Sequence, residues 1–158
     1  MNAAYRGIQD ARSLIRFLRK DVAENSNQYG VDPDRITLWG QGTGGYISYG
    51  AAYLDDFSEI DLDKFYGQDL LLYVDSNLVG DINGEKMAPL NIPNHGGYSS
   101  DFQLAVNIGG ALGDSSWIDG TMNEPPTIGF HVAADPFAPY VDGAVIVPTT
   151  GDFVVNVS

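Results

Sequence analysis

The first apolar pattern lies at the start of the chain, where hydrophobic residues recur every three or four positions. They are Ala4, Ile8, Ala11, Ile15, Leu18 and Val22. Because an α-helix turns once in about 3.6 residues, this spacing puts all of them on one face. The pattern predicts an amphipathic helix that is closed by the polar segment 25–30. Charged residues between the apolar positions, Arg16 among them, are expected to face water.

A short apolar segment, Ile36–Trp39, comes next and leads into a run of glycines. Residues 40–45 read Gly-Gln-Gly-Thr-Gly-Gly, and three small residues follow at 50–52. Four apolar residues between turn-forming segments predict a strand. The small residues predict a helix over about residues 45–54 that packs closely on a sheet. This part of the chain is therefore expected to form a strand, a tight turn and a helix.

The remainder alternates between polar loops and short strand candidates. Residues 55–101 begin with an acidic run and continue with loops rich in Gly, Asn and Pro, which predicts an insertion or lid-like region. Four apolar segments follow as strand candidates: Leu104–Ile108, Thr127–Val132, Ala144–Val147 and Phe153–Val157. Helices alternating with strands predict an α/β fold, with a mostly parallel sheet flanked by helices on both faces, in one domain over residues 1–158.

The chain is strongly acidic and contains no cysteine. Its 158 residues include 21 Asp and Glu against 8 Lys and Arg, a net charge of −13. This charge would repel a phosphate backbone, so nucleic acid is excluded as a partner, and it suits an exported, extracellular protein. Without cysteine there are no disulfides, thiolate nucleophiles or Cys-type zinc sites. No apolar run approaches the roughly 18 residues of a membrane-spanning helix.

Motifs for metals and cofactors match the chain only in part. The segment 75–86 begins like an EF-hand, but Val79 and Lys86 stand where that loop needs oxygen ligands. The glycines at 40, 42 and 45 fit the dinucleotide pattern G-x-G-x-x-G, which stays open as an alternative, although Asp61 and Asp63 follow in a polar run. We expect no metal and no cofactor, and a solvated acidic run.

Four segments together resemble the carboxylesterase and lipase type of α/β-hydrolase, close to its secreted bacterial branch. They are Asp10–Leu18, Tyr29–Ile36, Trp39–Gly45 and Pro125–Pro139, in the order that the family has them. In this family the nucleophile lies in the pattern G-x-S-x-G, on a sharp turn from strand to helix. The resemblance implies a partial α/β-hydrolase fold that begins midway and ends before the family's histidine loop.

Position by position, the resemblance places Gly42 at the nucleophile, Thr43 at a backbone N–H of the oxyanion hole, and Asp135 at the triad acid. Glycine has no side-chain oxygen, and no histidine follows Asp135. His95 and His131 precede Asp135, so either would break the family's order of nucleophile, acid and histidine. The chain is therefore expected to be an inactive carboxylic-ester hydrolase, a pseudoenzyme.

Two further interpretations stay open. One is a non-catalytic module that binds a small ester or acyl-like ligand in the hydrolase cleft. The other is an incomplete gene product, in which the strand Ile36–Trp39 lacks a neighbour and exposes an apolar edge. An exposed strand edge predicts association between copies of the chain.

Overall fold

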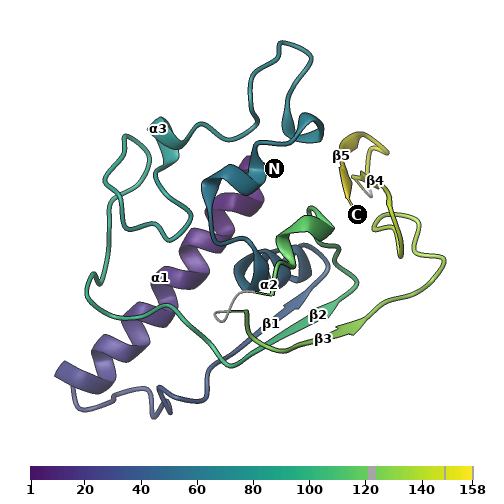
Figure 1. The fold of residues 1–158 in the computed structure, drawn as a ribbon. Helices are drawn as coiled ribbons and strands as arrows, with labels where there is room; N and C mark the ends of the chain where they lie inside the picture. The colour runs from purple at the N-terminus through teal and green to yellow at the C-terminus, as the bar shows by residue number, and fades with distance from the viewer. Residues whose placement is uncertain (121–123, 148, 158) are drawn as a thin grey trace.

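The computed structural model describes residues 1–120, 124–147 and 149–157, and Figure 1 shows their path. Two helices dominate, α1 (Asn2–Glu24) and α2 (Thr43–Tyr53). The strands are β1 (Thr37–Gln41), β2 (Leu104–Ile108), β3 (Thr127–Phe130), β4 (Gly143–Ile146) and β5 (Phe153–Val157). Short helical turns lie between them: η1 (Phe57–Ile60), η2 (Asp63–Phe65), α3 (Ser76–Val79) and η3 (Ser115–Trp117).

The central sheet is parallel, in the order β1-β2-β3. Its register aligns Trp39 with Val106 and Val106 with Ile128, so these three side chains form one row across the sheet. β4 and β5 form a separate antiparallel pair at the C-terminal end. A parallel sheet with helices packed on it confirms the predicted α/β fold. Each predicted strand and long helix is present; β2 and β5 have the predicted bounds, and the ends of the others are shifted by a few residues at most.

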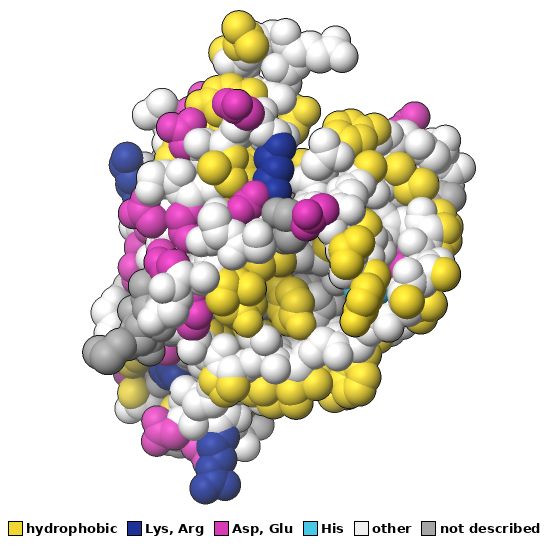
Figure 2. Space-filling view, turned by 45° about the vertical axis from the view of Figure 1, so that its right-hand side comes forward, with side chains coloured by type: hydrophobic (Ala, Val, Ile, Leu, Met, Phe, Trp, Pro, Cys, Tyr) yellow, Lys and Arg dark blue, Asp and Glu magenta, His cyan; other side chains and the backbone are white. Residues whose placement is uncertain are grey.

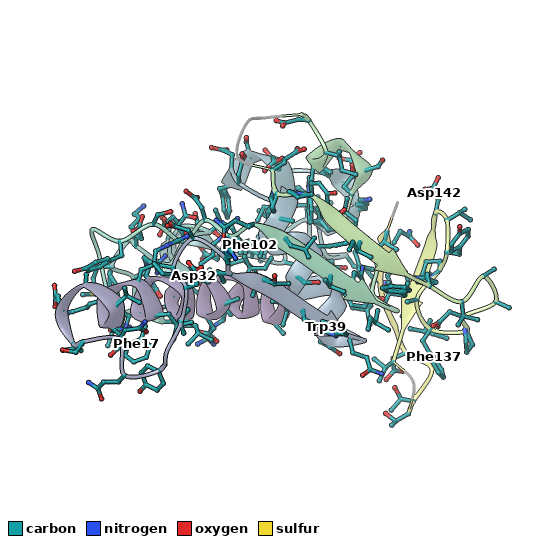
Figure 3. The ribbon with its side chains drawn as sticks, turned by 90° about the horizontal axis from the view of Figure 1, so that it is seen from below. Phe17, Asp32, Trp39, Phe102, Phe137 and Asp142 are labelled. Atoms are coloured by element: carbon teal, nitrogen blue, oxygen red, sulfur yellow. The ribbon has the colours of Figure 1, made fainter. Side chains whose placement is uncertain are left out.

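Both long helices lie on the same side of the sheet, so the expectation of helices on both faces is wrong for the described chain. α2 packs on β1 and β2, and α1 packs on α2. The opposite side, which faces the viewer in Figure 3, carries apolar side chains that remain in contact with solvent. Trp39 is 69% exposed, and Ile128 and Phe130 are 46% and 58% exposed. Parallel sheets usually have both faces covered, so this surface is unusual for its type.

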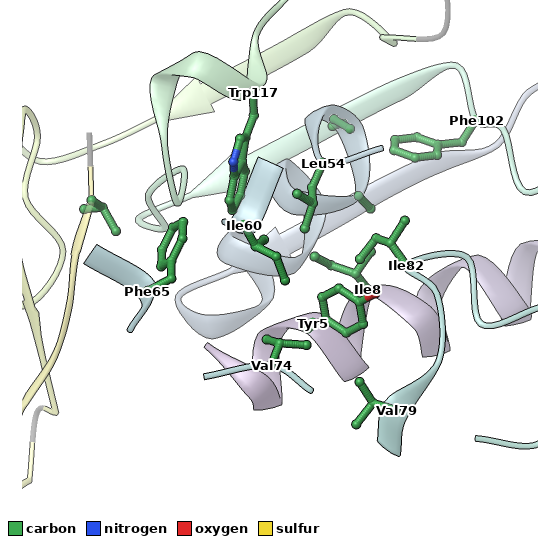
Figure 4. Close-up of a cluster of buried hydrophobic side chains, with 14 of the residues drawn as sticks. Tyr5, Ile8, Leu54, Ile60, Phe65, Val74, Val79, Ile82, Phe102 and Trp117 are labelled. Carbon is green, nitrogen blue, oxygen red and sulfur yellow. The ribbon is translucent and has the colours of Figure 1, made fainter. Parts of the chain in front are cut away.

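The core lies between α1, α2 and the irregular region 55–101. Figure 4 shows its largest cluster, in which Tyr5 and Ile8 from α1 meet Leu54, Ile60 and Phe65. The last two belong to the predicted insertion, so this region contributes to the same core as the helices. Whether it acts as a lid stays a prediction.

The acidic run at the start of that region has a local structural use. Asp56 accepts a hydrogen bond from the backbone N–H of Ser58, and Glu59 accepts one from the backbone N–H of Asp56. This is a capping box, which satisfies the free N–H groups at the start of η1. At least two of the acids in the run therefore stabilise a turn.

Arg16 is fully buried, so the prediction that it faces water is wrong. The segment 79–94 lies along α1 and covers a face that the apolar stripe left polar. Its backbone carbonyls accept hydrogen bonds from the helix: Arg16 Nε donates to Asn94 (3.2 Å), and Gln9 Nε2 donates to Val79 (2.7 Å). The segment 79–94 thus packs on α1 through hydrogen bonds, and the spacing of hydrophobic residues cannot predict such contacts.

No helix in the described ranges combines the length and the apolar character needed to cross a membrane.

β1 and α2 approach so closely that their backbones touch. A Cβ built on Gly40 would overlap the carbonyl group of Gly44 and lie 2.6 Å from the nitrogen of Gly45. A Cβ on Gly44 would meet nothing within 4 Å. The first glycine is therefore required by packing, and the second is not.

We predict that Gly40→Ala lowers the free energy of unfolding by about 2 kcal/mol or more, because strand and helix must separate to admit the methyl group. Gly44→Ala is the matched control. It lies in the first turn of α2, and it is expected to be neutral or to stabilise by up to about 1 kcal/mol, since alanine favours helix over glycine. Urea titration of both variants measures the difference, and equal destabilisation by the two would contradict the packing argument.

β1 and β3 are the outer strands of the parallel sheet in the described chain, and the sheet also has an apolar exposed face. We predict that copies of the chain associate as concentration rises and that Trp39→Lys weakens this, because a charge on an open sheet resists pairing. Tyr29→Lys is the control, since Tyr29 is 61% exposed and lies outside the sheet. Sedimentation velocity over a series of concentrations tests this, and a monomer throughout would refute it.

Candidate functional site

The turn between β1 and α2 has an uncommon backbone conformation at Gly42, with φ 54° and ψ −118°. Its N–H donates to the carbonyl of Ile108 in β2 (2.8 Å), and its carbonyl accepts from the N–H of Gly45 (2.9 Å). Side chains of L-residues rarely tolerate such a positive φ. The turn is thus a sharp connection from strand to helix, in a conformation that glycine adopts readily and other residues only with strain.

The space beside Gly42 is open. A Cβ built there would meet no atom within 4 Å, so nothing in the described chain fills the place that a side chain would take. A serine hydroxyl would fit there sterically, at the cost of the backbone strain. With glycine at this position the turn presents no nucleophilic atom.

Thr43 is the first residue of α2, directly after the turn. The N–H groups in the first turn of a helix have no acceptor within the helix, and the helix dipole adds positive potential there. The backbone N–H of Thr43 is therefore of the type that stabilises a developing negative charge.

Asp135 lies in the loop that follows β3. Its Oδ1 accepts hydrogen bonds from the backbone N–H groups of Ala138 (3.0 Å) and Phe137 (2.8 Å). These two bonds lower the pKa of the carboxyl group below its ordinary value. Asp135 is consequently ionised at neutral pH, and much of its hydrogen-bonding capacity is used within its own loop.

The structure brings Gly42, Thr43 and Asp135 to the wall of one cavity of about 520 Å³, here named the elbow cavity. Most of the wall is apolar and comes from distant parts of the chain, including Ile8, Phe65, Trp117, Val145 and Val155. Tyr46, on the turn of α2 after Thr43, adds a hydroxyl to the wall. Burial, and then the negative charge of Asp135, raises the pKa of Tyr46 to about 12, so this hydroxyl stays protonated.

Phe65 and Trp117, two residues of the wall, are held by an ion pair that the sequence did not indicate. Lys64 in η2 forms an ion pair with Asp114, which also caps η3. Burial alone would raise the pKa of Asp114, but hydrogen bonds from Lys64 and Ser116 outweigh it and lower the pKa to about 2. The pair joins the two turns that carry Phe65 and Trp117, whose ring centroids lie 5.8 Å apart.

Neither histidine lies on the elbow cavity. His131 Nε2 is hydrogen-bonded to the carbonyl of Ala138 (2.9 Å), and its ring lines a different cavity. The ring of His95 packs against Phe17, which belongs to α1. In the described part of the chain, no imidazole is therefore available to remove a proton at position 42.

The acidic residues that were weighed as metal or cofactor ligands serve local turns. Asp75 caps α3, and Asp81 accepts from the backbone N–H groups of Glu85 and Lys86. Asp61, which the dinucleotide pattern would use, accepts from the Tyr66 hydroxyl and does not line the elbow cavity. Across the described residues, no three His, Cys, Asp or Glu side chains are arranged to hold a metal ion.

Sequence reasoning singled out Gly42, Thr43 and Asp135 but missed the rest of the wall. Tyr46 had a local signal, an aromatic residue one turn into the helix after the glycines. Phe65, Trp117 and Val145 had none, because they reach the cavity only through the folding of separate segments.

Comparison with known proteins gives one local likeness. Over 40 residues the chain is 45% identical to Secreted lipase 5 of Gibberella zeae. The match covers 25% of this chain and 7% of the lipase, so the chain corresponds to a small part of that protein. No protein-family model and no solved structure matches the chain. The likeness supports a lipase-like relationship for the matched quarter of the sequence.

Proposed function

We propose that this chain carries the nucleophile-turn region of a carboxylic-ester hydrolase scaffold of α/β type and does not itself hydrolyse esters through a serine. One observation carries the proposal. Gly42 has a positive φ at the sharp strand-to-helix turn, faces open space and lines a cavity, but it has no side chain with which to attack a carbonyl. The resemblance to the esterase and lipase family and the short likeness to a secreted lipase support the class of chemistry.

Of the other groups that such an enzyme needs, an oxyanion donor and an acid have counterparts at this cavity, and a base does not. The N–H of Thr43 and the ionised Asp135 border the same cavity as Gly42, as the family's oxyanion donor and acid would. The base is lacking, since neither histidine lines this cavity. Serine attack needs a base to take the hydroxyl proton, so restoring a hydroxyl alone would give a slow nucleophile.

The decisive experiment is to install the hydroxyl and test its reactivity. We predict that a fluorophosphonate probe leaves the unaltered chain unlabelled but slowly labels the Gly42→Ser variant at the substituted position. Gly42→Ala is the matched control, because it imposes the same backbone strain without an oxygen. Mass spectrometry of the labelled peptide and hydrolysis of p-nitrophenyl esters give the two readouts, and neither variant is expected to turn over esters measurably.

Labelling or saturable ester hydrolysis by the unaltered chain would overturn the proposal, because a different nucleophile would then be at work. Labelling of Gly42→Ala would point to the same conclusion. If Gly42→Ser folds but takes up no probe, the turn does not present its side chain as an esterase does.

A second candidate function rests on the apolar wall of the elbow cavity. A cavity of about 520 Å³ with mostly apolar lining and few polar groups has the character of a small-molecule site. We propose as the alternative that it binds a neutral ester or acyl-like ligand without turnover.

For this alternative we predict that methyl octanoate raises the midpoint of thermal unfolding of the chain. Val145→Phe, which places a larger side chain on the cavity wall, should abolish the rise. Val132→Phe is the control, since Val132 is 67% exposed and lines none of the cavities described. A flat response of the unaltered chain to the ester would exclude the binding function.

A further inference from the structure

A second cavity, of about 580 Å³, lies beside the outer strand of the parallel sheet, and we name it the β3 cavity. Its wall includes residues of α2, of β3, of the loop 110–118 and of the segment 139–141. Figure 2 shows a hollow on this side of the molecule with hydrophobic side chains around it. The β3 cavity shares few wall residues with the elbow cavity and contains none of Gly42, Thr43 and Asp135.

Several residues of the wall have aromatic or imidazole rings. Tyr49 and Tyr53, one turn apart on α2, meet edge to face with their centroids 5.9 Å apart. Across the cavity, His131 and Tyr140 lie 5.7 Å apart at 57°. Tyr140 is 64% exposed, so it presents a large ring surface to solvent at the rim. Exposed rings are costly to leave in water and are frequent where a ligand is bound.

The same wall carries hydroxyl groups and a free ring nitrogen. The hydroxyl of Tyr53 and Oγ1 of Thr127 are 2.8 Å apart, and burial raises the pKa of Tyr49, so its hydroxyl stays protonated. Because a carbonyl can only accept, His131 Nε2 donates to Ala138, which leaves Nδ1 as the ring nitrogen that remains for a ligand. The cavity therefore combines ring faces with hydrogen-bonding groups of both kinds.

Gly129 in β3 keeps the floor of the cavity free. A Cβ at this position would lie 2.5 Å from the hydroxyl oxygen of Tyr49, so the tyrosine side chain would have to move to admit it. With glycine there, the tyrosine hydroxyl can reach the strand and remain on the cavity wall.

The charge of the wall sets it apart from the rest of the surface. None of the described residues that line the β3 cavity is Asp, Glu, Lys or Arg, although the chain has 29 such residues and a net charge of −13. A neutral wall gives no counter-charge to an ionic ligand, and the negative chain around it would repel an anion. The ligand that fits is uncharged.

From these observations we propose that the β3 cavity binds a pyranose unit of an uncharged oligosaccharide. The apolar C–H face of the sugar ring packs against Tyr140, and its hydroxyls exchange hydrogen bonds with Tyr53 and His131. This site goes beyond the function proposed for the elbow cavity and stands whether or not that proposal holds.

The test uses saturation-transfer NMR and calorimetry on the whole chain with maltohexaose, cellohexaose and mannohexaose. At least one of these is expected to bind saturably, while an oligogalacturonate of equal length binds at least about tenfold more weakly, because it is anionic. Tyr140→Ala should weaken binding by about tenfold, and Tyr53→Phe, which keeps the ring but removes the hydroxyl, by several-fold. Tyr29→Ala, at an exposed tyrosine outside this wall, should leave affinity unchanged.

Absence of binding by all three uncharged hexasaccharides would overturn the proposal. So would equal affinity for the anionic oligomer, or affinity that is indifferent to Tyr140→Ala in a variant whose unfolding transition is unchanged. The assignment to a sugar also fails if phenol displaces the bound hexasaccharide completely and Tyr53→Phe leaves its affinity unchanged. The cavity would then recognise only an aromatic ring.

Discussion

The backbone contact between the end of β1 and the start of α2 is the constraint on which the rest of the structure depends. Gly40 admits the carbonyl of Gly44, and Gly42 supplies the positive φ that turns the chain from strand to helix within one residue. This contact seats α2 directly on β1 and β2, and α1 then packs on α2. The same turn places the first N–H groups of α2 at the elbow cavity. Fold and candidate site therefore share one cause, a turn made of glycines.

The parts of the fold that the sequence predicted are those with local causes. The stripe in α1, the glycine spacing after Trp39 and the apolar run Leu104–Ile108 each have a period or a turn that a single segment determines. The buried position of Arg16 was missed, since carbonyl groups of a distant loop cover it. The two cavities could not be predicted either, because residues such as Phe65, Trp117 and Tyr140 reach them from separate segments with no shared pattern. Gly42 and Asp135 were placed through a resemblance, and their roles stay a proposal.

The loop after β3 connects the two cavities. The backbone of Ala138 donates its N–H to Asp135 and accepts at its carbonyl from His131. Asp135 faces the elbow cavity and His131 faces the β3 cavity, so one residue's peptide groups hold both side chains. The two peptide groups that flank Ala138 therefore contact one side chain from each cavity. The two cavities are connected by hydrogen bonds within one short loop.

Position 42 and Asp135, which the resemblance places at the nucleophile and the acid, contribute differently to the stability of the chain. A serine at position 42 would make no contact within 4 Å of its Cβ and would hold a φ that costs an L-residue about 1–3 kcal/mol, so glycine there relieves strain without loss of packing. Asp135 ties its loop through two backbone hydrogen bonds, and its removal would cost stability whether or not catalysis occurs. Stability alone therefore favours glycine at the turn and the hydrogen-bonded Asp135 in its loop, independently of any activity of the chain.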